Sequence, residues 1–190
     1  LRSHLGAAVL EDFSIGTGAV GVVVNEKDLP AAADIIDHTM DARFVISVGT
    51  DLRGKGQGFG VDHIFSQDRR KTWIVLRTRT TAENPAVASI TPAVPAAGWA
   101  EREFQDLLGI RAEGHPDPRR LVLADDWPEG LHPLRKDFPH DYKPEPVIDA
   151  AQPLAAPPGN SVTIPIGPFF PVLEEPVFIK VFVEGEDVVG

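Results

Sequence analysis

Histidines and carboxylates gather in one part of the chain, and such side chains bind metals or move protons in catalysis. His115 and Asp117 are close in sequence, and His132, His140 and Asp141 follow in the same segment. None of them has the HxxxH or HExxH spacing that places two imidazoles on one helix face. We therefore expect no metal site. An independent metal- or ligand-binding module built on His115, Asp117 and His132 stays open as an alternative.

Other catalytic patterns are also missing. The chain has no cysteine, which excludes a thiolate nucleophile, a cysteine-ligated iron–sulfur cluster and a disulfide framework. No serine stands in a GxSxG elbow. The glycine-rich stretch 54–60 has neither GxGxxG nor GK followed by Ser or Thr, and it is expected to be a loop between two strands. We expect no catalytic residue and no cofactor in this chain.

Arginines and acids alternate through residues 101–137, with tryptophans among them. The planar guanidinium pairs with carboxylates through two hydrogen bonds and stacks on aromatic rings. Trp99, Trp127 and Phe138 are the large side chains that protein interfaces favour. The pattern therefore predicts either a docking surface or a segment that these pairs hold to its own domain, and both interpretations remain open.

Composition narrows the partners. The formal net charge is −10, so duplex nucleic acid is an improbable partner, because its binding requires neutralisation of phosphates. No apolar run approaches the ~20 residues of a membrane span, and no signal-peptide pattern opens the chain. We expect a soluble, cytoplasmic protein that meets a membrane only through partners.

The first part of the chain predicts an α+β fold. Residues 19–24 form a short β-branched run, which indicates a buried strand. Asp28 is then expected to cap a helix that has Pro30 in its first turn and whose apolar face consists of Leu29, Ala32, Ala33, Ile36 and Met40. Strands are expected at 44–48, 61–66 and 72–80, the last two forming a hairpin. A strand–helix–β-meander domain results, with a short edge strand at 89–91.

A short helix is predicted over 97–108, where Ala100, Phe104, Leu107 and Leu108 form an apolar stripe. Arg102 and Asp106 are four residues apart and are expected to pair on its outer face, away from the stripe, with Glu101 and Gln105. Gly109 suits a left-handed helix end. An irregular segment follows and has too few apolar residues to form a core of its own.

Most of the 18 prolines lie after position 90, and residues 141–160 are expected to be an extended linker. Residues 177–183 and 187–189 flank Glu-Gly-Glu and predict a second hairpin. The fold is therefore expected to be an α+β domain followed by a short helix and a long, extended, Pro-rich C-terminal ribbon. We divide it into a core domain (1–96), a helix and docking ribbon (97–140), a linker (141–160) and a hairpin region (161–190).

Three motifs in order resemble the C-type subunit of the respiratory NADH:quinone oxidoreductase (complex I) and its counterpart in energy-converting nickel–iron hydrogenases. WAERE at 99–103 with DLLGI at 106–110 is similar to W-x-E-R-E…D-L-F-G-I of that family. GHPDPRR at 114–120 is similar to G-H-P-D-L-R-R. DW at 126–127 with HPLRKDFP at 132–139 is similar to D-W…H-P-L-R-K-D-Y-P.

A second, shorter resemblance covers residues 162–190. IPIGP at 164–168, EP at 175–176 and VEGE at 183–186 are similar to the opening of the partner catalytic polypeptide, which is the D-type subunit of complex I or the hydrogenase large subunit. Phe169 and Phe170 stand where that opening has a residue followed by His, so no family histidine is carried over.

The resemblance implies a non-catalytic scaffold subunit, peripheral to the membrane, that positions redox-active neighbours. Iron–sulfur clusters and a quinone or nickel–iron site are expected in partners, namely a D-type subunit and iron–sulfur subunits. The alternative is the N-terminal part of a fused C–D or hydrogenase large subunit, hence an enzyme fragment. The residues expected to contact partners are Trp99, Glu101, Arg102, Glu103, Asp106, His115, Asp117, Arg119, Arg120, Trp127, His132, Arg135, Lys136 and Asp137.

Overall fold

A computed structural model describes residues 2–143, 156–170 and 176–189. Contacts within the chain divide it into two units, Leu1–Pro146 and Val147–Gly190. Most of the predicted linker 141–160 lies outside the described residues. The mixed α+β class that the sequence predicts is confirmed: most regular structure is sheet, with few helices.

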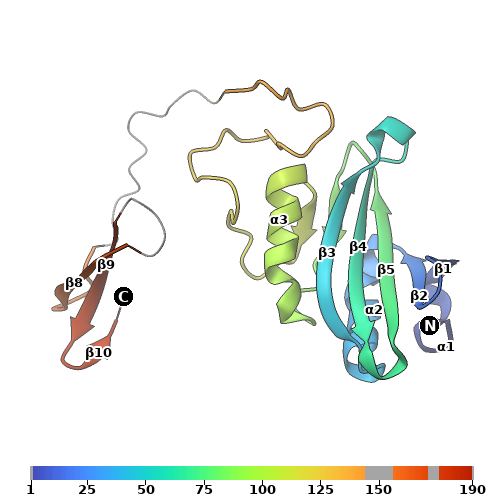
Figure 1. Cartoon of the computed structure of the whole chain (residues 1–190), viewed down its shortest axis with the longest axis horizontal. Helices are drawn as coiled ribbons and strands as arrows, with labels where there is room; N and C mark the ends of the chain where they lie inside the picture. The colour runs from blue at the N-terminus through green and yellow to red at the C-terminus, as the bar shows by residue number, and fades with distance from the viewer. Residues whose placement is uncertain (1, 144–155, 171–175, 190) are drawn as a thin grey trace. The chain divides into compact units, whose positions relative to one another are not determined.

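The first unit is built on a five-stranded sheet in the order β1-β2-β5-β4-β3 (Figure 1). Its strands are β1 (Val9–Ser14), β2 (Ala19–Val24), β3 (Arg43–Asp51), β4 (Phe59–Gln67) and β5 (Thr72–Thr80). β2 and β5 are parallel, and every other neighbouring pair is antiparallel. After β2 the chain crosses one face of the sheet, enters at the far edge as β3 and returns as the predicted meander to pair with β2.

The crossing segment is helical. α2 (Leu29–Asp34) continues as one π-helical stretch, η3 (Ile35–Thr39). The predicted apolar face is confirmed, because four of its five members are buried and Met40 packs against the same core. The prediction that the Asp28 side chain caps this helix is wrong: its carboxylate accepts a hydrogen bond from Asn25 Nδ2 at 3.2 Å and binds no helix N–H.

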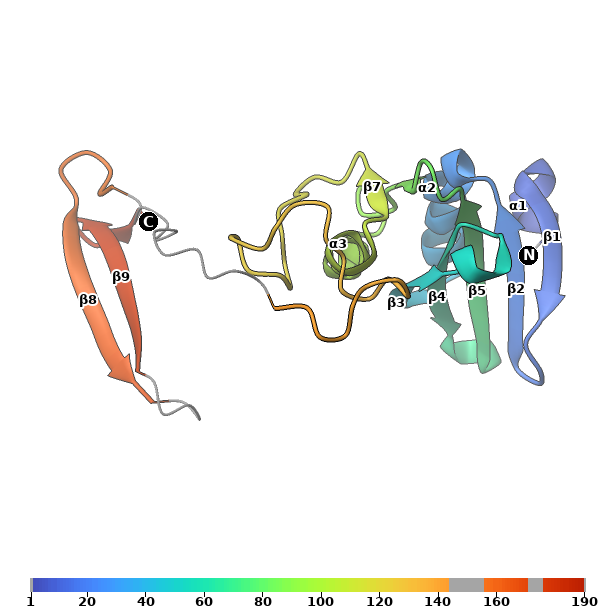
Figure 2. The same ribbon diagram turned by 90° about the horizontal axis from the view of Figure 1, so that it is seen from above.

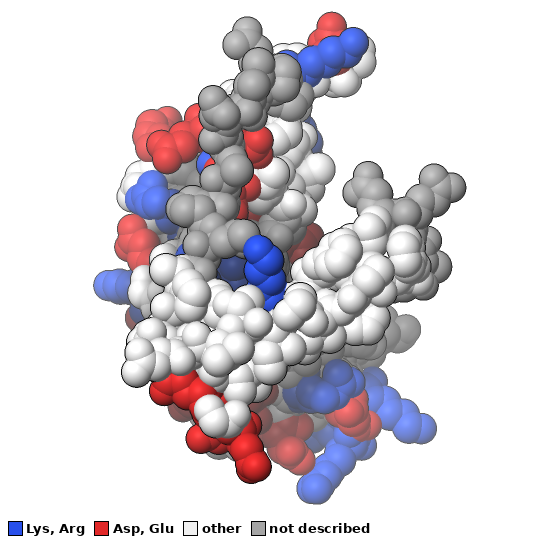
Figure 3. Space-filling model, turned by 90° about the vertical axis from the view of Figure 1, so that its left-hand side faces the viewer, with Lys and Arg blue, Asp and Glu red and all other residues white. Residues whose placement is uncertain are grey.

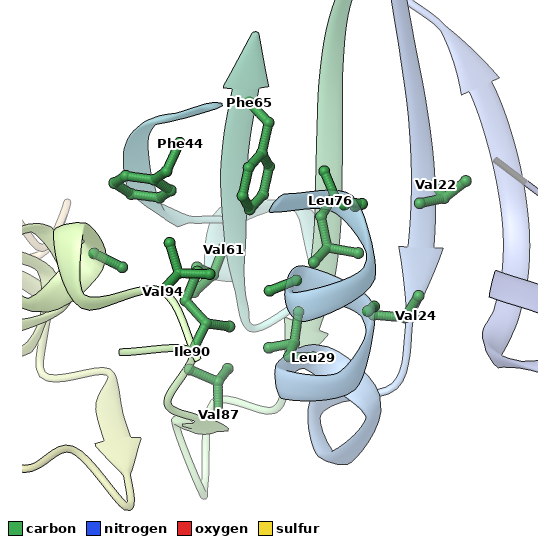
Figure 4. Packing of buried hydrophobic residues seen from close by; sticks show 14 of the residues in the cluster. Val22, Val24, Leu29, Phe44, Val61, Phe65, Leu76, Val87, Ile90 and Val94 are labelled. Carbon is green, nitrogen blue, oxygen red and sulfur yellow. The ribbon is translucent and has the colours of Figure 1, made fainter. Parts of the chain in front are cut away.

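The core lies between the sheet and the elements that cover one face of it (Figure 4). Along β4, Phe59, Val61, His63 and Phe65 are fully buried, as alternation on a pleated strand requires. Phe44 and Phe65 meet edge to face, with ring centroids 5.6 Å apart. The strand expected at 61–66 is thus confirmed, with every second side chain in the core.

The helix that follows the meander is α3 (Gly98–Leu108), which lies beside β3 (Figure 2). The two-stranded parallel sheet of β6 (Ala86–Ala88) and β7 (Arg111–Glu113) lies before and after it in sequence. The edge strand predicted at 89–91 is wrong: the strand is β6, three residues earlier, and at 89–91 the Ile90 N–H donates to the Glu101 side chain of α3. β1 and β7 carry charged residues on short runs, and the sequence pattern missed both.

Short helical turns complete the first unit. They are α1 (Arg2–Leu5) and the 3-10 turns η1 (Gly6–Ala8), η2 (Glu26–Asp28), η4 (Arg53–Lys55), η5 (Asp68–Arg70) and η6 (Pro95–Ala97). Residues 54–58 of the glycine-rich stretch lie in the β3–β4 connection, as predicted, whereas Phe59 and Gly60 begin β4. No helix in the described part of the chain is long and apolar enough to cross a bilayer.

The second unit contains a three-stranded antiparallel sheet in the order β10-β9-β8. Its strands are β8 (Val162–Phe169), β9 (Val177–Glu184) and β10 (Asp187–Val188). The predicted hairpin of residues 177–183 and 187–189 is confirmed as β9 and β10. The sequence pattern missed β8, because Pro165 and Pro168 interrupt its run of β-branched residues.

His63 is a polar group inside the core of the first unit. Its Nδ1 lies 2.7 Å from Ser47 Oγ, and its Nε2 has no partner among the described residues. Burial alone lowers the pKa of His63 from 6.5 to about 3. The imidazole is therefore neutral in the folded protein at any pH at which the protein is ordinarily handled.

Stability should consequently fall with acid before the carboxylates titrate. The folded-state pKa of His63 is below its unfolded value, so the unfolded chain binds the proton first as the pH drops below 6.5. We expect a loss of about 2 kcal/mol between about pH 6.5 and 4.5 from this group. His63→Leu should flatten that slope in urea unfolding, whereas His4→Gln, at an exposed histidine, should keep it. An unchanged slope in His63→Leu would contradict the assignment.

Candidate functional site

The first turn of helix α3 carries a buried carboxylate. Glu101 is fully buried, and its two oxygens accept hydrogen bonds from Ser89 Oγ (2.5 Å), Thr91 Oγ1 (2.7 Å) and the backbone N–H of Ile90 (2.7 Å). Its position in the first turn also suits the positive end of the helix dipole. A buried charge is tolerated where donors surround it. Glu101 therefore joins α3 to the segment after β6.

His115 closes this corner from the other side. Its Nε2 lies 3.0 Å from the carbonyl oxygen of Gly98 and therefore donates to it, while its Nδ1 accepts the N–H of Asp117 at 3.0 Å. A ring with one donating and one accepting nitrogen is neutral. The 3.9 Å approach of Nε2 to Glu101 is thus not an ion pair.

The segment 114–143 contains no helix or strand, and α3 binds its backbone directly. Arg102 donates from Nε to the carbonyl of Arg119 (2.7 Å) and from Nη2 to that of Arg120 (2.8 Å). Gln105 Nε2 donates to the carbonyl of Pro118 at 3.0 Å. We call residues 114–143 the ribbon.

Asp106 supplies the complementary acceptor. One oxygen, Oδ2, accepts the backbone N–H groups of Leu121, Val122 and Leu123 at 2.8, 2.9 and 3.2 Å. The predicted Arg102–Asp106 pair is wrong, because each side chain binds the ribbon backbone instead. Glu101 and Asp106 were predicted outside the apolar stripe and are both buried, since each binds polar groups of another segment.

The ribbon also satisfies the free carbonyls at the end of α3. The carbonyl oxygens of Asp106, Leu107 and Leu108 accept from His132 Nδ1 (2.8 Å), the N–H of Leu134 (3.0 Å) and Arg135 Nε (2.7 Å), respectively. These carbonyls have no partner within a helix, and a guanidinium suits the negative end of the dipole. Partial burial lowers the pKa of His132, which keeps the ring neutral.

Gly109 makes this arrangement possible. Its φ of +71° forms the left-handed helix end that the sequence predicts. A Cβ at this position would collide with the His132 imidazole and the Arg135 guanidinium. Both side chains are fixed by their bonds to the helix carbonyls, so neither could move without losing one.

A second attachment joins the ribbon to the end of β3. The almost fully buried carboxylate of Asp51 accepts from three groups of Arg53 and from the N–H of Lys136 at 3.0 Å. Arg53 also binds both oxygens of Asp137, at 2.6 and 3.0 Å. The Arg53 guanidinium holds the pKa of Asp51 and of Asp137 below the usual range. Arg53 and Arg135 each lie over the Phe59 ring, at 5.1 and 5.3 Å.

The far part of the ribbon has a small aromatic cluster. Trp127, Phe138 and Tyr142 lie with ring centroids 5.3 to 6.4 Å apart. Arg120 Nη1 donates to the carbonyl of Trp127 at 2.6 Å, and Trp127 Nε1 donates to that of Leu131 at 3.0 Å. The ribbon is thus held by polar contacts and three rings in place of an apolar core.

The residues predicted to bind partners divide into three sets by exposure. Glu101 and Asp106 are buried. The partly exposed ones are Arg102, His115, Asp117, Arg120, Trp127, His132 and Arg135, although the side chain of His115 itself is only 3% exposed. The exposed ones are Trp99, Glu103, Arg119, Lys136 and Asp137.

Sequence reasoning missed Asp51, Arg53 and Gln105, which hold the ribbon from outside it or from α3. For Asp51 and Arg53, the one signal in the sequence is that an arginine follows an aspartate by two residues, just after a predicted strand. The exposed surface of the site consists of the outer face of α3 with Trp99 and Glu103, four residues apart, and of the ribbon. Three quarters (74%) of Trp99 is exposed. Within the described residues no group of three His, Asp or Glu side chains is arranged to hold a metal ion.

Comparison with known proteins gives a family match over residues 22–144, to the family described as respiratory-chain NADH dehydrogenase, 30 Kd subunit. The chain is 36% identical to hydrogenase-4 component G of Escherichia coli (strain K12), over 100% of this chain and 35% of that protein. It is 35% identical to formate hydrogenlyase subunit 5 of the same strain, over 88% of this chain and 30% of that protein. The chain thus spans about a third of the length of these two relatives.

A third relative is matched over most of its own length. The C-type subunit of the NADH-quinone oxidoreductase of Geotalea uraniireducens (strain Rf4) is 30% identical, over 73% of this chain and 84% of that protein. Among solved structures, a chain of the archaeal membrane-bound sulfane sulfur reductase aligns with a TM-score of 0.57 at 19% identity, over 71% of this chain and 79% of that chain. A fragment of Nqo5 aligns with a TM-score of 0.50 at 23% identity, over 56% of this chain and 88% of that chain. These two likenesses concern the fold.

Replacing Gly109 should disturb the ribbon as well as the helix end. Gly109→Ala adds a left-handed alanine, at about 1 kcal/mol, and displaces His132 and Arg135, at about 1–3 kcal/mol more. Gly114→Ala is the matched control, because Gly114 also has a positive φ (+84°) but has open space around it. Urea unfolding should show the larger loss in Gly109→Ala, and equal losses would refute the contact.

Asp106→Ala should free part of the ribbon. Three backbone N–H groups lose their acceptor, which should cost about 2–3 kcal/mol and speed amide hydrogen exchange at residues 121–123. Asp125→Ala removes an exposed carboxylate from the ribbon and should change stability by less than about 0.5 kcal/mol. Unchanged exchange at 121–123 in Asp106→Ala would show that the carboxylate does not hold the ribbon.

Proposed function

The chain belongs to the family of the respiratory-chain NADH dehydrogenase 30 kDa subunit, and on this basis we propose that it is a non-catalytic scaffold in a membrane-associated oxidoreductase complex of the complex I or hydrogenase type. Its role in this proposal is positional: electron transfer takes place in neighbouring subunits that it holds together. Those neighbours are a D-type, hydrogenase-large-subunit-like polypeptide and iron–sulfur subunits. They would carry the clusters and the quinone or nickel–iron site, and this chain would carry no cofactor.

The observation that carries the proposal is the way in which the ribbon is held. Its backbone is fixed to α3 and β3 through the side chains of Arg102, Asp106 and Asp51. A long irregular segment ordered this thoroughly presents a fixed surface, and a preorganised surface loses less entropy when a partner binds. A fixed shape that serves no catalytic constellation is what a scaffold requires.

The exposed side of this surface has the composition of an interface. Trp99 on α3 and Leu134 on the ribbon are exposed large side chains, 74% and 60% exposed. The ribbon also exposes charged groups of both signs, among them Arg119, Lys136 and Asp137. An apolar anchor surrounded by polar groups is the usual arrangement of a binding hot spot.

The similarity to hydrogenase-4 component G extends over the whole chain, whereas the C-type relative from Geotalea uraniireducens matches 73% of it. We therefore place the parent complex nearer the hydrogenase type. The membrane is reached only through partner subunits in this proposal, and the chain lies on the cytoplasmic side. Nucleic acid has no place in it, in keeping with the net charge of −10.

Trp99→Ala should weaken assembly without unfolding the chain. The side chain is exposed, so the free energy of unfolding should change by less than about 0.5 kcal/mol, while loss of a hot-spot tryptophan should lower affinity for the partner tenfold or more, or about 2 kcal/mol. The measurement is affinity purification of the tagged chain from native membranes, with the recovered iron–sulfur and D-type subunits quantified by mass spectrometry.

Trp73→Ala is the matched control, because Trp73 is a half-exposed tryptophan on β5, away from α3 and the ribbon. It should leave the recovered subunits unchanged. Equal losses in both variants would move the interface away from α3. Recovery of no redox subunit with the unaltered, folded chain would refute the proposed function itself.

A further inference from the structure

One face of the sheet in the second unit carries aliphatic side chains and no charged one. Residues directly opposite each other in an antiparallel pair point to the same side, and so do alternate residues of one strand. The register pairs Val162 with Val183, Ile164 with Val181, and Ile166 with Ile179. These six β-branched residues therefore share one face, which we call the aliphatic face.

The opposite face is mixed. Thr163 opposes Phe182 and Pro165 opposes Lys180, with Glu184 farther along the strand. This is the alternation of a sheet that covers a core with one side and meets a polar environment with the other. The aliphatic face is thus built as an inner face.

Among the described residues, none covers the aliphatic face. No residue of 156–170 or 176–189 is buried, and Val162 and Ile179 are 65% and 48% exposed. Single exposed aliphatic residues are common, but six adjoining ones without a charge mark an interaction site. In the space-filling view, residues that are neither basic nor acidic, drawn white, form a continuous band across the side that faces the viewer (Figure 3).

We propose that the aliphatic face is an interface, and that its occupant is an apolar surface of a hydrogenase-type component, from the part of that component that lies outside the stretch matched by this chain. The inference rests on the proposed function and names the partner of a second surface.

The comparisons favour this occupant. The family match ends at residue 144, and the C-type relative covers 73% of the chain. Hydrogenase-4 component G, in contrast, matches all of the chain, including the β8–β10 sheet, and nearly two thirds of that component lies beyond the match. The stretch that forms this sheet therefore has a counterpart in a hydrogenase component. An apolar surface from the rest of such a component would cover the aliphatic face and provide the second layer that a one-sided sheet needs.

Neighbouring residues of β9 offer a matched test. Val181 lies on the aliphatic face and Phe182 on the mixed face, and both are partly exposed. A photoreactive benzoylphenylalanine is placed at one or the other position in the complete native complex, irradiated, and mapped by mass spectrometry. We expect position 181 to cross-link to the hydrogenase-type component outside the matched stretch, several-fold more than position 182.

Substitutions at the same positions give an independent measure. Val181→Asp should lower the yield of assembled complex at least tenfold, because a carboxylate would be buried in the interface, while Phe182→Asp should keep it within about twofold. Cross-links from position 181 to a second copy of this chain, to residues 1–146 or to any other protein would overturn the assignment. The same holds for cross-linking that is equal at 181 and 182.

Failure here is distinct from failure of the proposed function. Co-purification of iron–sulfur subunits depends on α3 and the ribbon in the first unit. If those subunits are recovered but the expected cross-link is absent, the occupant proposed for the aliphatic face is refuted and the scaffold function still stands.

Discussion

The constraint on which the first unit depends is that every buried backbone donor and acceptor needs a partner. The ribbon has no helix or strand to provide one. Side chains of α3 do so instead: Arg102 binds two ribbon carbonyls and Asp106 binds three ribbon N–H groups. The ribbon in turn binds the carbonyls at the helix end. Helix and ribbon are therefore one structural unit, and neither would be ordered in this way without the other.

These mutual hydrogen bonds between helix and ribbon explain why the carboxylate of Asp106 is tolerated at the C-terminal end of α3. Asp106 is in the last turn of α3, where the helix dipole repels negative charge, and it is almost fully buried. Both costs are offset because Asp106 Oδ2 accepts three N–H groups and Arg135 lies at the same helix end. The strong acid–base signal of this segment thus arises at least from folding, and the docking interpretation stays a proposal that is compatible with it.

Local patterns in the sequence predicted the regular elements well. β2, β5 and α3 follow from β-branched runs and helical spacing, because packing on one face imposes those periods. The burial of Glu101 and Asp106 did not follow, since a carboxylate looks the same in sequence whether its donors are water or a segment far along the chain. β8 was missed for a similar reason: its prolines argue against a strand locally, whereas pairing with β9 supports one. Partners distant in sequence decide both cases.

The two units differ in how complete they are, and this difference bears on function. The first unit buries a core of its own between its sheet and its helices, although large hydrophobic residues such as Trp73 and Trp99 stay exposed on it. In the second, the aliphatic face of the sheet is exposed, and no described residue of β8, β9 or β10 is buried. A complete domain can bind and release partners, whereas an incomplete layer is stable only in permanent contact with its cover. A chain that joins the two kinds of surface is suited to hold a large assembly in register.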